Sequence, residues 1–216
     1  MNFDYPFTEH DAQAAFDDWG CNCGPSSLAF ALQIGLDKVR GKIPGFEAKR
    51  YTSPTMMKAA LANLGREFKR IKNADGEVTI PTMFSPHGIS LVRVQWCGPW
   101  TKKGANPKWA YRQTHWIATW AFSEEVKPIG GCKTTRMGLF VFDCNGGIRS
   151  FASWQKEIVP ALTATYPRAD GNWFPTDVWR IVPVEMENTY PPYAAKPSGY
   201  DGMTGFQIED LCDAED

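Results

Sequence analysis

Three residues, far apart along this chain of 216, have the side chains that nucleophilic catalysis needs. Cys23 is a candidate nucleophile, His115 a candidate general base and acid, and Asp143 a candidate for the group that orients the imidazole. A thiol needs a nearby base to become a thiolate at neutral pH, and that base needs a third group to fix its tautomer. If the fold brings the three side chains together, they can perform acyl transfer through a thioester intermediate.

The residues around Cys23 predict a tight turn that leads directly into a buried helix. Gly24 allows a close turn, and Pro25 suits the first helical turn, where its missing N–H costs nothing. The residues that follow, through Leu32, are small or apolar, which predicts a helix buried on most of its faces. A cysteine at such a helix N-terminus feels the positive end of the helix dipole, which favours the thiolate, and nearby backbone N–H groups can stabilise an oxyanion.

The elements that carry His115 and Asp143 decide whether the two side chains can meet. Helices precede strands in this chain, which predicts an α+β fold with N-terminal helices packed on a mainly antiparallel sheet. His115 lies at the start of a predicted strand over 114–122, and Asp143 lies at the end of the next one, over 138–143. If these strands are antiparallel neighbours, both side chains lie at one edge of the sheet, with the Cys23 helix packed across it.

We expect a single domain over residues 1–185, followed by an acidic tail over 186–216 that is extended or disordered because it cannot build a core. Within the domain, hydrophobic periodicity and the positions of Gly and Pro predict the remaining elements. The predicted helices span 11–16, 23 to about 37 or 38, 53–54 to about 65, and 151–166 with a bend at Pro160; further strands span 78–84, 89–96 and 173–183; loops span 40–52 and 101–113, and a hairpin arm spans 123–137.

Composition excludes several classes of partner. The net charge of −1 predicts no nucleic-acid partner, because such proteins carry a basic excess. The longest apolar runs are too short for a membrane span, and residues 1–6 lack the basic region and apolar core of a secretory signal. We therefore expect a cytoplasmic protein, with delivery into a host cell as the alternative.

The six cysteines show no repeated Cys-x-x-Cys pair, which predicts reduced thiols, although their even number leaves disulfides open.

Three short blocks of the sequence resemble papain-like cysteine peptidases. Cys-Gly-Pro-Ser-Ser-Leu-Ala over 23–29, with Trp19 upstream, is similar to the nucleophile segment, most of all in the bacterial and phage branch that includes bacteriocin-processing and YopT-type effector peptidases. His-Trp-Ile-Ala over 115–118 is similar to the histidine strand, and Phe-Asp-Cys-Asn-Gly-Gly over 142–147 to the Phe-Asp-x-Asn-x-Gly segment of YopT-type peptidases. The resemblance covers about residues 13–166. It implies a papain-like fold and a thiol protease acting on a protein or peptide substrate, with no cofactor and no metal.

The resemblance also implies a role for each matched residue. Cys23 would be the nucleophile, His115 the base and acid, and Asp143 the orienting group. Asn145 is the alternative to Asp143, because papain itself uses an amide at that place.

The oxyanion hole is where the sequence departs from the family pattern. Papain-like enzymes place a Gln about six residues before the nucleophile, and this chain has Asp17 there, which is a poor donor when ionised. Asn22, Gln13 or the indole N–H of Trp19 are the candidate replacements.

Other interpretations of the same residues stay open. Cys23 is also explained as a structural thiol, His115 as a satisfied core or edge histidine, and Asp143 as a cap on the following turn. The same triad serves deamidases and transglutaminase-type acyl transferases, and a catalytically weak papain-like fold can act as a binding module, for example in a phage or effector protein.

Cys21 raises two further alternatives. Together with Cys23, Cys144 and His115 it could form a zinc site, although Cys-x-Cys spacing matches zinc poorly. We interpret Cys21 instead as a packed thiol, or as the partner in a reversible disulfide that protects Cys23 from oxidation.

Overall fold

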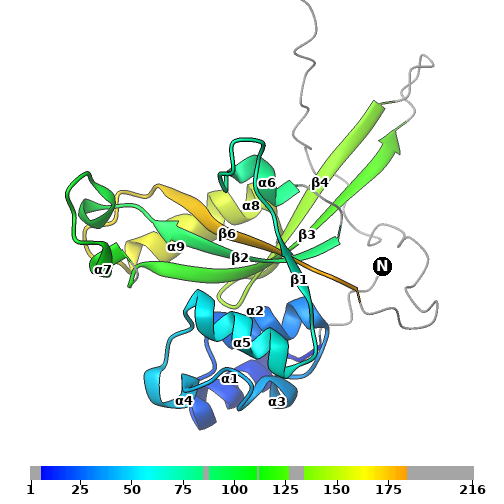
Figure 1. Ribbon diagram of the computed structural model, residues 1–216, viewed down its shortest axis with the longest axis vertical. Coiled ribbons are helices and arrows are strands. Elements are labelled where there is room, and N and C mark those ends of the chain that lie inside the picture. The colour runs from blue at the N-terminus through cyan, green and yellow to red at the C-terminus, as the bar shows by residue number, and fades with distance from the viewer. Residues whose placement is uncertain (1–5, 85–87, 111, 127–133, 184–216) are drawn as a thin grey trace, which may run out of the picture.

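The computed structural model describes residues 6–84, 88–110, 112–126 and 134–183. A layer of helices at the N-terminal end of the chain lies against one face of a six-stranded antiparallel sheet (Figure 1). Shorter helices lie on the opposite side of the sheet. The predicted α+β class, with N-terminal helices packed on an antiparallel sheet, is confirmed at this level of detail.

The helical layer is built from three longer helices and two single turns. The longer helices begin at residues whose side chains accept a backbone N–H of the first turn, Thr8, Asn22 and Ser53. The predicted helix start at Ser53, with Pro54 in the first turn, is confirmed. The elements are α1 (Glu9–Trp19), α2 (Cys23–Leu32), α3 (Leu36–Val39), α4 (Phe46–Lys49) and α5 (Pro54–Asn63).

The sheet has the strand order β1-β6-β2-β3-β4-β5. Its two longest strands are neighbours, paired from Ala118 opposite Phe142 to Val126 opposite Thr134. Residues 127–133 of the predicted hairpin arm lie outside the described residues. The strands are β1 (Phe68–Arg70), β2 (Gly88–Trp96), β3 (Thr114–Val126), β4 (Thr134–Asp143), β5 (Gly147–Ser150) and β6 (Trp173–Ile181).

Two hydrophobic cores lie on the two faces of the sheet, because successive side chains of a strand point to opposite sides. In β3, Trp116 belongs to the core shared with the helical layer, and Ile117 belongs to the core on the opposite face. Every residue of α2 from Gly24 to Leu32 is buried, as the predicted apolar helix requires. Phe30 of α2 stacks on Phe142 of β4, with ring centroids 4.2 Å apart.

The remaining helical segments connect or cover the strands. A continuous helical run follows β5, and its middle is a π-helical turn that ends two residues before Pro160, which cannot donate a backbone hydrogen bond. This run confirms the helix predicted over 151–166. The segments are α6 (Ile80–Phe84), η1 (Pro99–Thr101), α7 (Pro107–Ala110), α8 (Phe151–Ser153), η2 (Trp154–Ile158) and α9 (Val159–Ala164).

Several local predictions are wrong. The nucleophile helix ends at Leu32 rather than near residue 37 or 38, because Gln33 adopts a left-handed conformation with φ of 54°. Residues 80–84 form a helix, not a strand, because Pro81 has no N–H for a ladder and the Thr82 hydroxyl closes a local turn by donating to the Thr79 carbonyl at 2.6 Å.

Short elements were also not predicted. The three-residue strand β1 and the four-residue strand β5 are too short for a clear alternation of side chains. The predicted loops over 40–52 and 101–113 contain the single turns α4 and α7.

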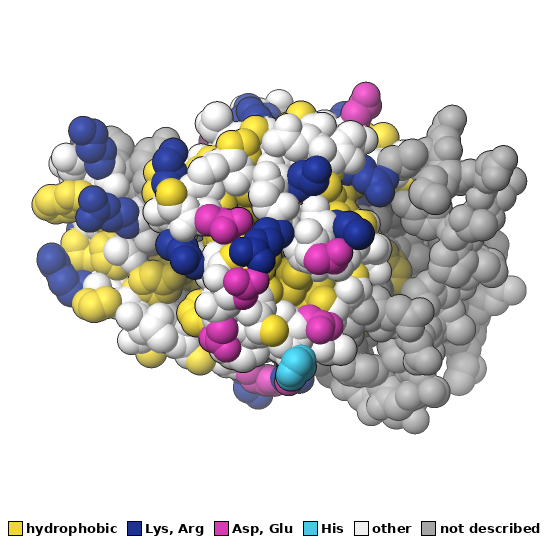
Figure 2. All heavy atoms as spheres, turned by 90° about the horizontal axis from the view of Figure 1, so that it is seen from below, with side chains coloured by type: hydrophobic (Ala, Val, Ile, Leu, Met, Phe, Trp, Pro, Cys, Tyr) yellow, Lys and Arg dark blue, Asp and Glu magenta, His cyan; other side chains and the backbone are white. Residues whose placement is uncertain are grey.

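Acidic and basic side chains are interspersed over the face of the helical layer, with hydrophobic side chains between them (Figure 2). Within the described residues, none of the helices has the length and apolar character needed to cross a bilayer. The predicted tail over 186–216, which includes Cys212, lies outside the described residues.

Candidate active site

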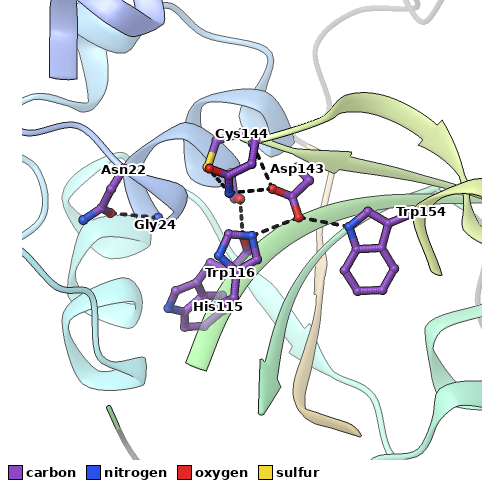
Figure 3. A network of polar contacts seen from close by, with 9 residues as sticks. Asn22, Gly24, His115, Trp116, Asp143, Cys144 and Trp154 are labelled. Carbon is purple, nitrogen blue, oxygen red and sulfur yellow. Dashed lines mark hydrogen bonds and ion pairs between the residues drawn. The ribbon is translucent and has the colours of Figure 1, made fainter. Parts of the chain in front are cut away.

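The side chains of His115 and Asp143 lie together at the end of the sheet where one strand begins and the next one ends, as the sequence predicts. His115 is the second residue of β3, and Asp143 is the last residue of β4, its antiparallel neighbour. His115 Nε2 and Asp143 Oδ2 are 3.0 Å apart, and both side chains are buried (Figure 3). The prediction that these two side chains lie next to each other is therefore confirmed.

Asp143 is held by more partners than His115 alone. Trp154 Nε1 donates to Oδ2 at 2.9 Å, while the backbone N and Nδ2 of Asn145 donate to Oδ1 at 2.9 and 3.0 Å. Burial is the largest influence and raises the pKa of Asp143, but the charge of His115 and these hydrogen bonds together outweigh it and hold the pKa at about 2. Asp143 is therefore a carboxylate at neutral pH, with both oxygens fixed in position.

Asn145 supports Asp143 instead of replacing it. Both of its bonds to Asp143 go to Oδ1, whereas His115 bonds to Oδ2. Figure 3 shows Asp143 between the imidazole and the Trp154 indole. Of the two orienting groups considered from the sequence, the carboxylate is the one that contacts the imidazole.

Cys23 is the first residue of α2, as predicted, and it is half-buried. The helix begins at Asn22, whose Oδ1 accepts the N–H of Gly24 at 3.2 Å. Burial is the largest influence and raises the pKa of the Cys23 thiol, but the charge of His115, a hydrogen bond with its imidazole and a hydrogen bond from the Trp116 backbone together lower it below the ordinary value. Cys23 thus contacts the same imidazole as Asp143.

The peptide of Trp116 fixes α2 beside His115. Its carbonyl accepts the Ser27 hydroxyl at 2.9 Å, and its N–H donates to the Cys23 thiol. Cys23 and Ser27 are four residues apart and therefore lie on one face of the helix. The β3–β4 pairing ends at Ala118, so the edge of β3 at Trp116 is open to receive this helix face.

The imidazole of His115 connects the thiol and the carboxylate. Because Nε2 bonds Asp143, Nδ1 is the ring nitrogen left for Cys23. Burial is the largest influence and lowers the pKa of His115, but the negative charges of Cys23 and Asp143 and their hydrogen bonds outweigh it and raise the pKa above the ordinary value. The rings of Trp96 and His115 are stacked, with their centroids 6.0 Å apart. This arrangement favours a thiolate–imidazolium pair.

The candidate oxyanion donors lie in different environments. Gln13 is exposed and its Nε2 donates to Asp17 at 2.9 Å, so it is engaged along α1. Trp19 is buried and packs edge-on against Phe46, with the two ring centroids 5.8 Å apart. It also lines a pocket of about 270 Å³ within the helical layer. Asn22 caps α2, and its Nδ2 donates to the Arg50 carbonyl at 3.0 Å.

The first turn of α2 offers a donor that sequence analysis did not single out. Gly24 N–H is taken by Asn22, and Pro25 has no N–H. Among the described residues, the backbone N–H of Cys23 has no hydrogen-bond partner. This group lies next to the thiol at the positive end of the helix, where an oxyanion is stabilised.

Two further residues of the site were not identified from the sequence. Trp154 lies within the helix predicted over 151–166, and nothing in its spacing indicates a bond to Asp143. Cys144 is exposed, and its Sγ lies within 4.8 Å of a ring nitrogen of His115 and of an oxygen of Asp143.

Cys21 lies apart from this arrangement. Its side chain is buried, and its sulfur is 3.4 Å from the Ser26 hydroxyl. Burial raises the pKa of Cys21 to about 11, so it stays a protonated, packed thiol at neutral pH. His10 is exposed, and His87 lies outside the described residues.

Comparisons with protein-family models and with curated proteins find no match for this chain. The residues and geometry of the site therefore carry the functional argument.

Proposed function

We propose that this chain is a papain-like cysteine peptidase whose nucleophile is Cys23. The observation that most supports the proposal is the position of one buried imidazole, which contacts the thiol of Cys23 and, at 3.0 Å, the carboxylate of Asp143. A structural thiol has no need of a base that is itself oriented by a fully bonded carboxylate.

In the proposed reaction, the Cys23 thiolate attacks the carbonyl carbon of a peptide bond. The backbone N–H of Cys23 and the dipole of α2 stabilise the oxyanion that forms. His115 then gives its Nδ1 proton to the departing amine, which leaves a thioester on Cys23. Water attacks the thioester while His115 takes a proton from it, and release of the acid restores the thiolate–imidazolium pair.

Asp143 acts in this sequence by holding the imidazole through Nε2. Its low pKa keeps it ionised while His115 gains and loses a proton. Trp154 and Asn145 keep the carboxylate from rotating, because each oxygen has a fixed donor.

The test combines thiol labelling with mass analysis of substrates. The chain is treated at neutral pH with an epoxide-type thiol probe, and variants Cys23→Ala and His115→Ala are compared with Cys97→Ser, which alters a half-buried thiol that hydrogen-bonds Thr101. Selective labelling of Cys23 that is lost in His115→Ala, together with cleavage of an unfolded protein substrate, is the expected result.

Other outcomes of this test separate the alternatives. Labelling of Cys23 with conversion of glutamine to glutamate and no cleavage would indicate a deamidase, and new cross-linked amides would indicate a transglutaminase-type enzyme. Slow, uniform labelling of several thiols would overturn the enzyme proposal and favour a binding module.

A further inference from the structure

Two cysteines, not one, approach the imidazole of His115. The Cys23 thiol hydrogen-bonds the ring, and Cys144 Sγ lies within 4.8 Å of a ring nitrogen. Cys144 follows Asp143 directly, at the start of the turn between β4 and β5, and the Nδ2 of Asn145 lies 3.4 Å from its sulfur. The mechanism proposed above gives Cys144 no task.

We propose that Cys144 is a site of reversible oxidation that protects the nucleophile by forming a disulfide with Cys23. This inference rests on the proposed function only in that Cys23 must be the reactive thiolate. It replaces Cys21, the partner suggested by the sequence, because the Cys21 sulfur lies beside Ser26, whereas Cys144 Sγ lies within 4.8 Å of a ring nitrogen of His115.

The chemistry needs a hydroperoxide as oxidant. The Cys23 thiolate attacks the terminal oxygen of the peroxide, the O–O bond breaks, and the departing alkoxide or hydroxide takes the proton of the imidazolium. Cys23 becomes a sulfenic acid, and His115 becomes neutral. His115 then takes the proton of the Cys144 thiol, the Cys144 sulfur attacks the Cys23 sulfur, and hydroxide leaves and recovers that proton as water. Two thiols supply the two electrons that reduce the peroxide.

The surroundings of Cys144 suit its attack on the sulfenic acid of Cys23 better than a direct reaction with the peroxide. Partial burial of its thiol and the negative charges of Cys23 and Asp143 raise the pKa of Cys144, so it is not the sulfur that reacts with peroxide. When Cys23 becomes a sulfenic acid its charge disappears, and the neutral imidazole nearby can accept the proton of Cys144. The S–S bond requires the two sulfurs to approach to about 2.05 Å, so at least one of the two residues must move for the disulfide to form.

The experiment oxidises the reduced full chain with limiting hydrogen peroxide, blocks free thiols, and maps disulfides and oxidised cysteines by mass spectrometry. The expected result is a Cys23–Cys144 disulfide, with nearly complete recovery of Cys23 labelling after reduction. In Cys144→Ser, Cys23 should pass on to sulfinic and sulfonic acids, so that most of the recoverable labelling is lost. Cys97→Ser should behave as the unaltered chain does.

The result that overturns the inference is equally specific. A disulfide from Cys23 to Cys21, or equal recovery of Cys23 in the chain with and without Cys144, would exclude the role proposed for Cys144. Labelling of Cys23 before oxidation is measured on the same samples, so loss of the proposed function is recognised separately. Near-ultraviolet circular dichroism and a second variant, Cys144→Ala, show whether any effect comes from misfolding.

Discussion

The indole N–H of Trp154 donates to Asp143 Oδ2 at 2.9 Å, the same oxygen that lies 3.0 Å from His115 Nε2. The indole comes from the helical run after β5, so a residue outside the three blocks that resemble papain-like peptidases helps to hold the orienting carboxylate in position. Trp154 is fully buried, and its ring belongs to the core on the face of the sheet opposite the helical layer. The geometry of the site is thus coupled directly to the packing of this core.

Trp154→Phe should weaken the site more than it weakens the fold. The substitution keeps an aromatic ring but removes the N–H, so we expect a loss of about 1–3 kcal/mol in stability and a fall of roughly tenfold in the rate of Cys23 alkylation. The matched control is Trp179→Phe, because the buried indole N–H of Trp179 has no hydrogen-bond partner within the described residues. If both variants lower the alkylation rate equally, the bond to Asp143 has no special role.

Asp143→Asn tests the charge of the orienting group while preserving its shape. Without the carboxylate the imidazolium loses one of the two negative charges that raise the pKa of His115. The pH at which the imidazolium loses its proton should therefore fall, and peptidase activity should fall by about 10² or more. The pH dependence of the activity measures this: its alkaline limb should move to lower pH, and an unchanged limb would contradict the role given to Asp143.

The low pKa of Asp143 also predicts a loss of stability in acid. The pKa is about 2 in the folded chain against an ordinary value of 3.8. A lowered folded pKa means that the stabilisation is fully present above the ordinary value and disappears as the pH falls from about 4 to about 2, with a difference on the order of 2–3 kcal/mol. Denaturant unfolding near neutral pH and near the acid end of this range measures the change in the free energy of unfolding, with Asp143→Asn as the control. That variant cannot titrate at this position, so it should lose less on acidification; equal losses would mean that the stability lies elsewhere.

Ser27 and Ser26 form a matched pair for testing how α2 is attached to β3. Both are buried, but Ser27 donates to the Trp116 carbonyl, whereas Ser26 contacts the Cys21 sulfur. Ser27→Ala should cost about 1–3 kcal/mol, because it leaves a buried carbonyl unsatisfied, and should also slow alkylation of Cys23. Ser26→Ala should leave the alkylation rate nearly unchanged. Chemical denaturation and labelling of both variants measure these effects, and a larger effect on labelling from Ser26→Ala would show that the anchor is misidentified.

The meeting of His115 and Asp143 was predictable from the sequence for a simple reason. Each residue marks one end of a long apolar strand, and the two strands follow one another, so antiparallel pairing brings those ends together. The start of α2 at Cys23 was predictable for a similar reason, because Gly24 and Pro25 determine where a helix can begin.

What the sequence did not reveal depends on contacts between distant segments. The bond from Trp154 to Asp143 depends on how the helical run after β5 packs on the sheet, and no local pattern specifies that. Asn22 was a candidate oxyanion donor by residue type, but its side chain caps α2 and bonds the Arg50 carbonyl, a residue 28 positions away. The end of α2 depends on the left-handed conformation of Gln33, a residue that rarely adopts it.

The pH dependence of Cys23 alkylation tests the thiolate–imidazolium pair most directly. The pKa of Cys23 is lowered and that of His115 is raised, so the reactive pair should exist from below neutral pH until the imidazolium deprotonates above it. At about pH 6 Cys23 should react with iodoacetamide more than about tenfold faster in the unaltered chain than in His115→Ala, in which burial keeps the thiol protonated because the opposing charge of His115 is gone. A Cys23 that reacts only above pH about 8, at the same rate with and without His115, would contradict the pairing.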